Sequence, residues 1–372
     1  MRSPLSLAAL VLAALLSLSA CVSAGSPSPG TDTQGQSAAA SVVAQATLKA
    51  AQYDYDGALA LLASGTSAEA AAAKAGITKA KDAAQPWAEP TKVPHLFWHP
   101  LVVDPARAFS TELAPADRAG NAQYMVTRSE FVAQLQSIYD KGYVLIHPER
   151  LYQLSDGVMT SVADRIKLPP GKKPLVISQD DVNYYKRWAD EGGFPAELKV
   201  AADGTVVNKY TDAAGATTEG AFDVVPIVDA FVRQHPDFSY RGDKGSIALT
   251  GYEGALGYRS SVRAYGDTAA TQQAAADAKR VADAMKAEGW NFASHTFGHI
   301  SYSASSAAQI KADMDRWKAE VEPITGPTPE LIYAFGSDIA NSIGKSYAAS
   351  DPKYQVLKDA GFSYFFPIDN SS

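Results

Sequence analysis

A short apolar strand leads directly into two histidines at residues 290–299, which read WNFASHTFGH. The apolar positions predict a strand over Asn291–Ser294, and His295 and His299 follow it. Two imidazoles four residues apart can bind one metal ion if the segment between them makes a helical turn. They can also be two unrelated polar residues of a loop. Because the chain has only six histidines, we interpret this pair as candidate metal ligands.

Six more apolar strands are predicted elsewhere, and helical patterns separate them. The clearest helix follows Thr127, which forms a capping-box pair with Glu130. Alternating strands and helices predict an α/β fold with a mainly parallel sheet, in which catalytic groups gather at the carboxyl ends of the strands. The six strands are predicted at Val93–Phe97, Tyr143–Ile146, Leu175–Ser178, Ser246–Leu249, Leu331–Phe335 and Tyr364–Pro367.

A second polar feature follows another of these strands at residues 175–181, which read LVISQDD. Adjacent side chains of an extended strand point to opposite sides, so Asp180 and Asp181 can share a site only if the chain turns tightly there. A surface turn is the alternative. One carboxylate with two histidines forms a set of three protein ligands, which is typical of a catalytic rather than a structural metal site.

Composition excludes several classes of protein. The chain has 372 residues, a net charge of −7 and one cysteine, Cys21. An acidic chain of this kind does not offer the broad basic surface that nucleic acid requires. A single cysteine excludes an intramolecular disulfide framework and a cysteine-based zinc finger.

The N-terminus has the pattern of an export signal. Arg2 precedes an apolar run over residues 5–18, which is too short for a comfortable membrane span. The segment ends Leu-Ser-Ala-Cys at Cys21 and resembles the lipobox of bacterial lipoproteins, in which the cysteine is lipidated. An ordinary signal peptide with a chance cysteine is the alternative. We therefore expect a signal peptide over 1–20 and a lipid anchor at Cys21, on the extracellular face of the bacterial cell membrane.

Two further segments flank or interrupt the α/β pattern. Residues 21–40 predict a flexible tether, and the Ala-rich residues 41–85 predict a hairpin of two helices, Ser41–Ala63 and Ser67–Ala83. Residues 189–222 predict an insertion over one end of the fold, with a β-hairpin that turns at Asp203-Gly204.

Taken together, the motifs of residues 93–372 resemble those of the polysaccharide deacetylases, which are carbohydrate esterases with a NodB homology domain. The family motif Thr-Phe-Asp-Asp-Gly corresponds to residues 178–182, SQDDV, and His-Ser/Thr-x-x-His corresponds to His295–His299. A Tyr-Pro-Tyr-Gly form of the third motif corresponds to residues 333–336, YAFG. The resemblance implies a distorted (β/α)7-type barrel, here preceded by the helical hairpin.

The resemblance also implies roles for these residues. Asp181, His295 and His299 would bind a divalent metal, most often zinc in the family. Asp180 would be the general base for the metal-bound water, which attacks an acetyl carbonyl. The backbone N–H of Phe335 would stabilise the oxyanion.

The chain departs from the family at several positions. Val182 replaces a glycine, so a positive φ there would be costly. Gln179 replaces a phenylalanine, and Ile332 stands where many members have an arginine that orients the base. The last family motif, with a general-acid histidine, has no counterpart before Ser372. His99, at the end of the first predicted strand, is the remaining histidine that could reach the site.

The sequence therefore predicts a metal-dependent hydrolase that removes acetyl groups from an extracellular or cell-envelope polysaccharide. Four aromatic or polar residues are candidates for substrate binding: Trp98, His99, Tyr252 and Tyr258. A carbohydrate-binding surface lipoprotein of the same fold with impaired catalysis is the alternative. A glycoside hydrolase fits less well, because it requires two separated carboxyl groups rather than adjacent aspartates beside two histidines.

Overall fold

The computed structural model describes residues 33–336, 338–339 and 346–367. Cys21, the predicted signal peptide and most of the predicted tether lie outside these residues. No helix in the described part of the chain is both long enough and apolar enough to cross a membrane.

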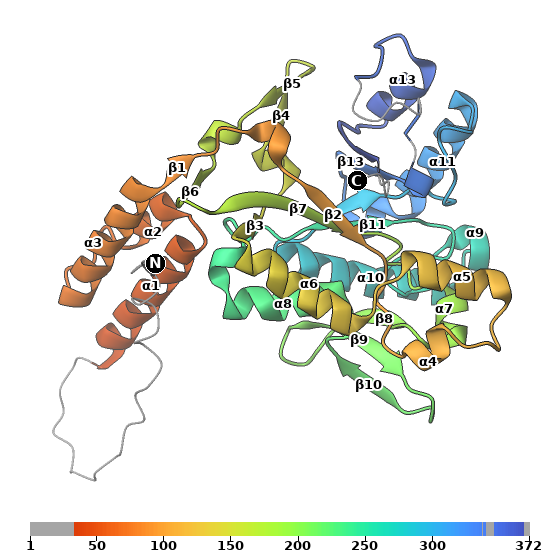
Figure 1. The fold of residues 1–372 in the computed structure, drawn as a ribbon, viewed down its shortest axis with the longest axis horizontal. Coiled ribbons are helices and arrows are strands. Elements are labelled where there is room, and N and C mark those ends of the chain that lie inside the picture. Colours follow the sequence, from red (N-terminus) through yellow and green to blue (C-terminus); the bar gives the residue numbers. More distant parts are fainter. Residues whose placement is uncertain (1–32, 337, 340–345, 368–372) are drawn as a thin grey trace, which may run out of the picture.

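The centre of the fold is one parallel sheet that contains all seven predicted strands (Figure 1). The strand order is β14-β13-β12-β11-β7-β2, and β3 pairs with the beginning of β7. The prediction of an α/β fold with a parallel sheet is confirmed. The strands are β2 (His95–Trp98), β3 (Tyr143–Leu145), β7 (Lys173–Gln179), β11 (Ser246–Leu249), β12 (Asn291–Ser294), β13 (Glu330–Tyr333) and β14 (Tyr364–Pro367).

The sheet curls into a half-barrel, which agrees with the predicted distorted barrel. Its two edge strands approach each other. The His95 ring on β2 lies 5.0 Å from the Phe366 ring on β14. Inside the curl, Phe366 and Phe97 pack against Ala248, Ala293 and Ile332. The two alanines leave room for aromatic rings from both edges to fill the interior.

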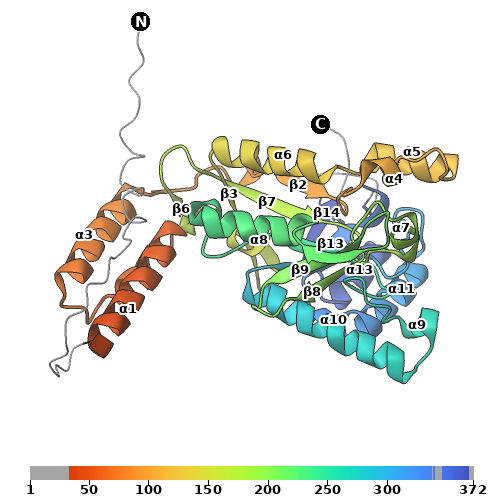
Figure 2. The same cartoon turned by 90° about the horizontal axis from the view of Figure 1, so that it is seen from below.

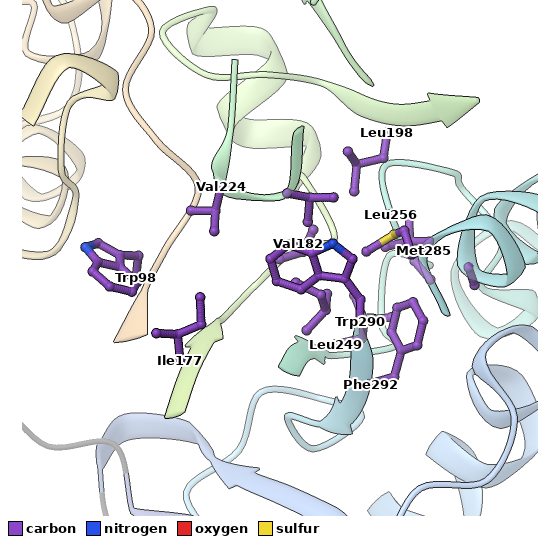
Figure 3. Packing of buried hydrophobic residues seen from close by; sticks show 14 of the residues in the cluster. Trp98, Ile177, Val182, Leu198, Val224, Leu249, Leu256, Met285, Trp290 and Phe292 are labelled. Atoms are coloured by element: carbon purple, nitrogen blue, oxygen red, sulfur yellow. The ribbon is translucent and has the colours of Figure 1, made fainter. Parts of the chain in front are cut away.

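Helices surround the sheet, and their apolar faces form the main core with it (Figures 2 and 3). In that core Trp290 and Met285 lie close to Leu249 and Phe292 (Figure 3). The predicted capping box of Thr127 and Glu130 is confirmed at the start of α6. The helices are α4 (Pro105–Ala108), α5 (Pro115–Tyr124), α6 (Arg128–Asp140), α7 (Lys186–Glu191), α8 (Val224–Gln234), α9 (Val262–Tyr265), α10 (Ala269–Ala287), α11 (Ala307–Glu320), α12 (Glu322–Thr325) and α13 (Pro352–Asp359).

The insertion is a small antiparallel sheet of β8 (Glu197–Val200), β9 (Val206–Thr211) and β10 (Thr217–Gly220). The predicted hairpin at Asp203-Gly204 is confirmed, because β8 and β9 pair across it. Strand β8 contacts α10 and β9 contacts α8, so the insertion fills the helical layer between them (Figure 2). Two further pairs are β1 (Gln85–Pro86) with β6 (Lys167–Leu168), and β4 (Tyr152–Ser155) with β5 (Val158–Ser161).

The N-terminal region contains three helices where the sequence predicted two: α1 (Thr33–Ala51), α2 (Tyr55–Leu61) and α3 (Ala68–Ala83). Helix α1 begins within the stretch predicted as a tether. The first predicted helix is broken at Tyr53, which has a φ of 65°. The Tyr53 ring stacks on Tyr240 at 6.0 Å, and its hydroxyl donates to the Asp237 carbonyl at 2.6 Å. This contact with the barrel fixes the break, and Asp54 then caps α2.

The three N-terminal helices lie at one end of the molecule, and α5 and α7 lie at the other end (Figures 1 and 2). The candidate site is at the second end.

Candidate active site

The carboxyl ends of β2, β7, β12 and β13 open into a cleft of about 870 Å³. Each of these strands contributes a predicted site residue to the lining: His99 after β2, Asp180 and Asp181 after β7, His295 and His299 after β12, and Phe335 after β13. Helices α5 and α7 provide another part of the wall. The sheet therefore brings together residues that lie up to 236 positions apart in the chain.

Asp181, His295 and His299 form a compact cluster. Asp181 Oδ1 lies 3.9 Å from the Nε2 atom of each histidine. One possible ligand atom from each of the three residues lies within 4.8 Å of the others. His295 Nδ1 lies 2.9 Å from the Ile332 carbonyl, which can only accept a hydrogen bond, so Nδ1 carries the proton and the Nε2 lone pair is free. The donor set fits a divalent metal.

A tight turn places Asp181 in the cluster beside Asp180. Asp181 has a φ of 57°, and the Asp180 N–H donates to the Trp98 carbonyl at 2.8 Å. The energetic cost predicted for a positive φ at Val182 does not arise, because the residue with the positive φ is Asp181. The Val182 side chain is buried in the main core. Tyr185 then holds the Asp181 carboxylate, to which its hydroxyl donates at 2.5 Å.

The two histidines meet through an irregular loop, without the helical turn that the sequence analysis gave as the condition for sharing one metal ion. Thr296 and His299 have φ values of 64° and 49°. Asp313 on α11 stabilises this loop, because its carboxylate accepts the Phe297 N–H at 2.6 Å and the Gly298 N–H at 2.8 Å. The histidine rings lie 5.2 Å apart as a result.

The environment shifts the pKa values of the two adjacent aspartates in opposite directions. Asp180 is 1% exposed, and its Oδ1 atom has no hydrogen-bond partner. Burial, and then the charge of Asp181, raise the pKa of Asp180 well above its usual value. Burial also acts to raise the pKa of Asp181, but His295, His299, His99 and Tyr185 together lower it below its usual value. One carboxyl is thus suited to accept a proton and the other to remain an ionised ligand.

Two histidines of the cleft, His295 and His99, have a lowered pKa, which favours their neutral form. Burial lowers the pKa of His295 to about 4, which suits a metal ligand. Burial also lowers the pKa of His99, against the effect of Asp181, which raises it. His99 lies on the same cleft as the cluster but is not one of its three members.

Not every predicted substrate residue lies in the cleft. Trp98 and His99 line it, and the Phe335 ring is exposed there, 4.5 Å from the His299 ring. Tyr252 and Tyr258 are not among the described residues that line it. Tyr252 instead stacks on Tyr185 at 5.0 Å and so supports the residue that holds Asp181. The loop that follows β11 folds back toward Phe297, whose carbonyl accepts the N–H groups of Gly251 and Tyr252.

Three parts of the site were missed by the sequence analysis: Tyr185, Asp313 and the wall made by α5 and α7. Tyr185 follows Asp181 by four residues, a spacing that could have suggested it. Asp313 lies on a helix 14 residues beyond His299, and no local pattern marks it. The α5 and α7 wall depends on packing between segments that are far apart in the chain.

Comparisons with known proteins bear on this cleft. Residues 266–361 match the family model described as polysaccharide deacetylase. The matched segment contains His295, His299 and Phe335, whereas Asp180 and Asp181 precede it. The match supports the family that the motifs resemble.

Two other comparisons add no argument about the site. A solved structure, "Streptococcus pyogenes deacetylase PplD in complex with acetate", aligns with 73% of this chain and 80% of that chain, at 17% sequence identity and a TM-score of 0.36. No curated protein matches the chain.

Proposed function

We propose that the protein is a metal-dependent hydrolase that removes acetyl groups from a polysaccharide. The proposal depends above all on one arrangement: Asp181, His295 and His299 cluster in an open cleft, with the unpartnered carboxyl of Asp180 beside them. The deacetylase match over residues 266–361 supports the reaction. N-acetyl groups and acetyl esters both fit the chemistry.

Asp181 Oδ1 and the Nε2 atoms of His295 and His299 would hold the cation, for which we propose zinc. When bound, such a cation acts as a Lewis acid toward a carbonyl oxygen and lowers the pKa of a coordinated water toward about 7. Asp180 would accept the proton of the attacking water at Oδ1, which is buried beside the cluster and has no other hydrogen-bond partner. The Phe335 backbone N–H would donate to the oxygen of the acetyl group as charge develops on it.

We propose that the protein is located on the outer face of the cell membrane. A lipid at Cys21 would anchor it, and an acetylated envelope glycan would be its substrate. Cys21 as the only cysteine and the apolar run before it support this proposal. Cell fractionation of the wild type and of Cys21→Ser tests it, because the variant should leave the membrane fraction.

The direct test of the reaction is acetate release from acetylated glycans by the purified protein. Release should stop after treatment with a chelator and return when zinc is restored. A metal-loaded protein that releases no acetate from any acetylated glycan would contradict the proposal.

His99 lines the cleft and is not used by the metal cluster, so its neutral imidazole would pass the proton accepted by Asp180 on to the leaving group. We predict that His99→Gln lowers kcat by about 10² to 10⁴-fold, the usual range for a lost proton donor. KM and metal content should change little. A rise in KM at unchanged kcat would instead assign His99 to substrate binding alone.

A carbohydrate-binding protein with impaired catalysis is the second candidate. The observation in its favour is that Asp180 Oδ1 has no partner, since Ile332 stands where many deacetylases have an orienting arginine. Glycan binding without turnover, unchanged in Asp180→Asn, would support this candidate over the enzyme.

A further inference from the structure

Strand β11, at the centre of the sheet, reaches the metal cluster indirectly. It lies between β7 and β12, and none of its four residues, all of which the structure describes, lines the cleft. Thr250, the residue that follows it, is buried, and its hydroxyl oxygen lies 2.8 Å from the hydroxyl oxygen of Tyr185. Tyr185 is also buried and contacts Asp181. Two buried hydroxyl groups therefore connect β11 to a candidate metal ligand.

The direction of these two hydrogen bonds follows from the chemistry of the groups. An ionised carboxylate can only accept, so the Tyr185 hydroxyl donates its proton to Asp181 Oδ1, at 2.5 Å. The Tyr185 oxygen then acts as the acceptor of the second bond, and the Thr250 hydroxyl is its donor. Both bonds run in one direction, from Thr250 through Tyr185 to Asp181. In a buried chain of this kind each bond polarises the next one and strengthens it.

The backbone of Thr250 is fixed to the loop that carries Asp181. The side chain of Asn183, in that loop, is buried. Its Oδ1 atom accepts the Thr250 N–H at 3.0 Å, and its Nδ2 atom donates to the Thr250 carbonyl at 2.8 Å. The Tyr252 ring stacks on the Tyr185 ring at 5.0 Å, with 19° between the ring planes. These contacts leave the two hydroxyl groups little freedom to move relative to Asp181.

The Tyr185 bond falls on the carboxylate oxygen that faces both histidines. Asp181 Oδ1 lies 3.9 Å from the Nε2 atoms of His295 and His299, so Tyr185 contacts the same oxygen that would bind the cation. Asp181 also has a φ of 57°, which is uncommon for a residue with a side chain, so its conformation depends on the contacts around it. A carboxylate that rotated out of this bond would carry Oδ1 away from the two histidines.

We propose that Thr250 is a positioning residue, which acts through Tyr185 to hold Asp181 Oδ1 toward the metal ion and thereby raises the metal affinity of the site. The inference deepens the proposed function and rests on its metal dependence. Neither Thr250 nor Tyr185 is among the described residues that line the cleft. Their effect therefore falls on metal binding, and the rate of the metal-loaded protein should change little.

Three substitutions test the two hydroxyl groups. Thr250→Val keeps the shape of the side chain but removes the donor, and it should lower zinc affinity by about tenfold, the lower end of the range for a group behind a ligand. Thr250→Ser keeps the donor and should retain most of the wild-type affinity. Tyr185→Phe should lose about 100-fold, because it removes the bond to Asp181 itself. Competition with a chromophoric chelator measures zinc affinity without any glycan. An unchanged affinity in Thr250→Val or Tyr185→Phe, or an equal loss in Thr250→Ser, would overturn the proposal.

Tyr184→Phe is the matched control for a merely structural role. The Tyr184 hydroxyl is also buried and also donates to a buried carboxylate, that of Asp223 at 2.7 Å, which is not part of the described metal cluster. The control should lose stability in a thermal melt, as the other variants do, but keep its zinc affinity. A loss of zinc affinity in Tyr184→Phe as large as that in Thr250→Val would overturn the specific role of Thr250.

The double variant Tyr185→Phe/Thr250→Val tests whether Thr250 acts through Tyr185. If it does, the Thr250 hydroxyl has no route to Asp181 once the Tyr185 hydroxyl is absent. The double variant should then bind zinc as tightly as Tyr185→Phe alone. Losses that multiply in the double variant would show that the two residues act independently, and would overturn the proposed order.

These zinc measurements separate the inference from the proposed function, because they need no substrate. If Thr250→Val weakens zinc binding but the zinc-loaded wild type releases no acetate from any acetylated glycan, the reaction is wrong and the positioning role stands. If the wild type shows zinc-dependent acetate release but Thr250→Val binds zinc as tightly as the wild type, the reaction stands and the positioning role is wrong. A wild type that binds no zinc would overturn both.

Discussion

His295→Ala is expected to lose the bound metal ion and acetate release together. The variant keeps only two of the three possible ligands, and His295 is the one whose Nε2 lone pair is oriented by a backbone contact, to the Ile332 carbonyl. Changing a group behind a ligand already costs about 10 to 100-fold in metal affinity, so removing the ligand costs at least that. Without the Lewis acid, turnover should fall by about 10³-fold or more.

Metal analysis of the purified variant, beside steady-state acetate release, measures this prediction. His235→Ala is the matched control, because His235 packs against Tyr139 and Phe231 and does not line the cleft. The wild type and the control should gain thermal stability when zinc is added, and His295→Ala should gain little, since ligand binding stabilises only a fold that binds it. A His295→Ala protein that retains one metal per chain would show that the cluster is not the metal site.

The sequence predicted the sheet well because strand signals are local. Each of the seven strands is a short apolar run, and the helices between them force parallel pairing. Parallel strands place their carboxyl ends at one edge, so one aspartate of the pair could be expected to meet His295 and His299, and the resemblance to the deacetylases implied that it is Asp181. The predictions failed where contacts between distant segments decide the conformation.

Tyr53 and Tyr252 illustrate that failure. Asp54 and Gly57 are only weak local signals of a helix break after Tyr53, and contacts with Tyr240 and Asp237 fix the break. The sequence analysis gave Tyr252 as a candidate for substrate binding, but the Phe297 carbonyl accepts the N–H groups of Gly251 and Tyr252, and the Tyr252 ring stacks on Tyr185. The residues that do line the cleft from α5 and α7 are held there by bonds such as that between Asn121 and Glu191. The spacing of apolar residues and the residue types of turns carry no information about contacts between residues that are far apart in the chain.

Asp180→Asn should abolish most acetate release while leaving the metal in place. Asp180 adjoins the cluster without being one of its three members, so the variant keeps all three possible ligands. It loses the carboxylate that would accept the proton of the attacking water, which costs about 10² to 10⁴-fold in kcat. The outcome thus differs from that of His295→Ala, where metal and activity disappear together. Turnover near the wild-type rate with a full complement of metal would exclude Asp180 as the base.

The same substitution should stabilise the metal-free fold at neutral pH. Burial raises the pKa of Asp180 in the folded chain, whereas in the unfolded chain this carboxyl has the ordinary aspartate pKa of about 3.9. A group with a raised folded pKa contributes its full stability below the unfolded pKa, and this stability is lost as the pH rises through the folded pKa. The unfolding free energy of Asp180→Asn should therefore match that of the wild type near pH 4 and exceed it increasingly toward neutral pH. Denaturant unfolding in chelator across this range measures the difference. Equal stabilities at neutral pH would contradict a raised pKa of Asp180 in the metal-free fold.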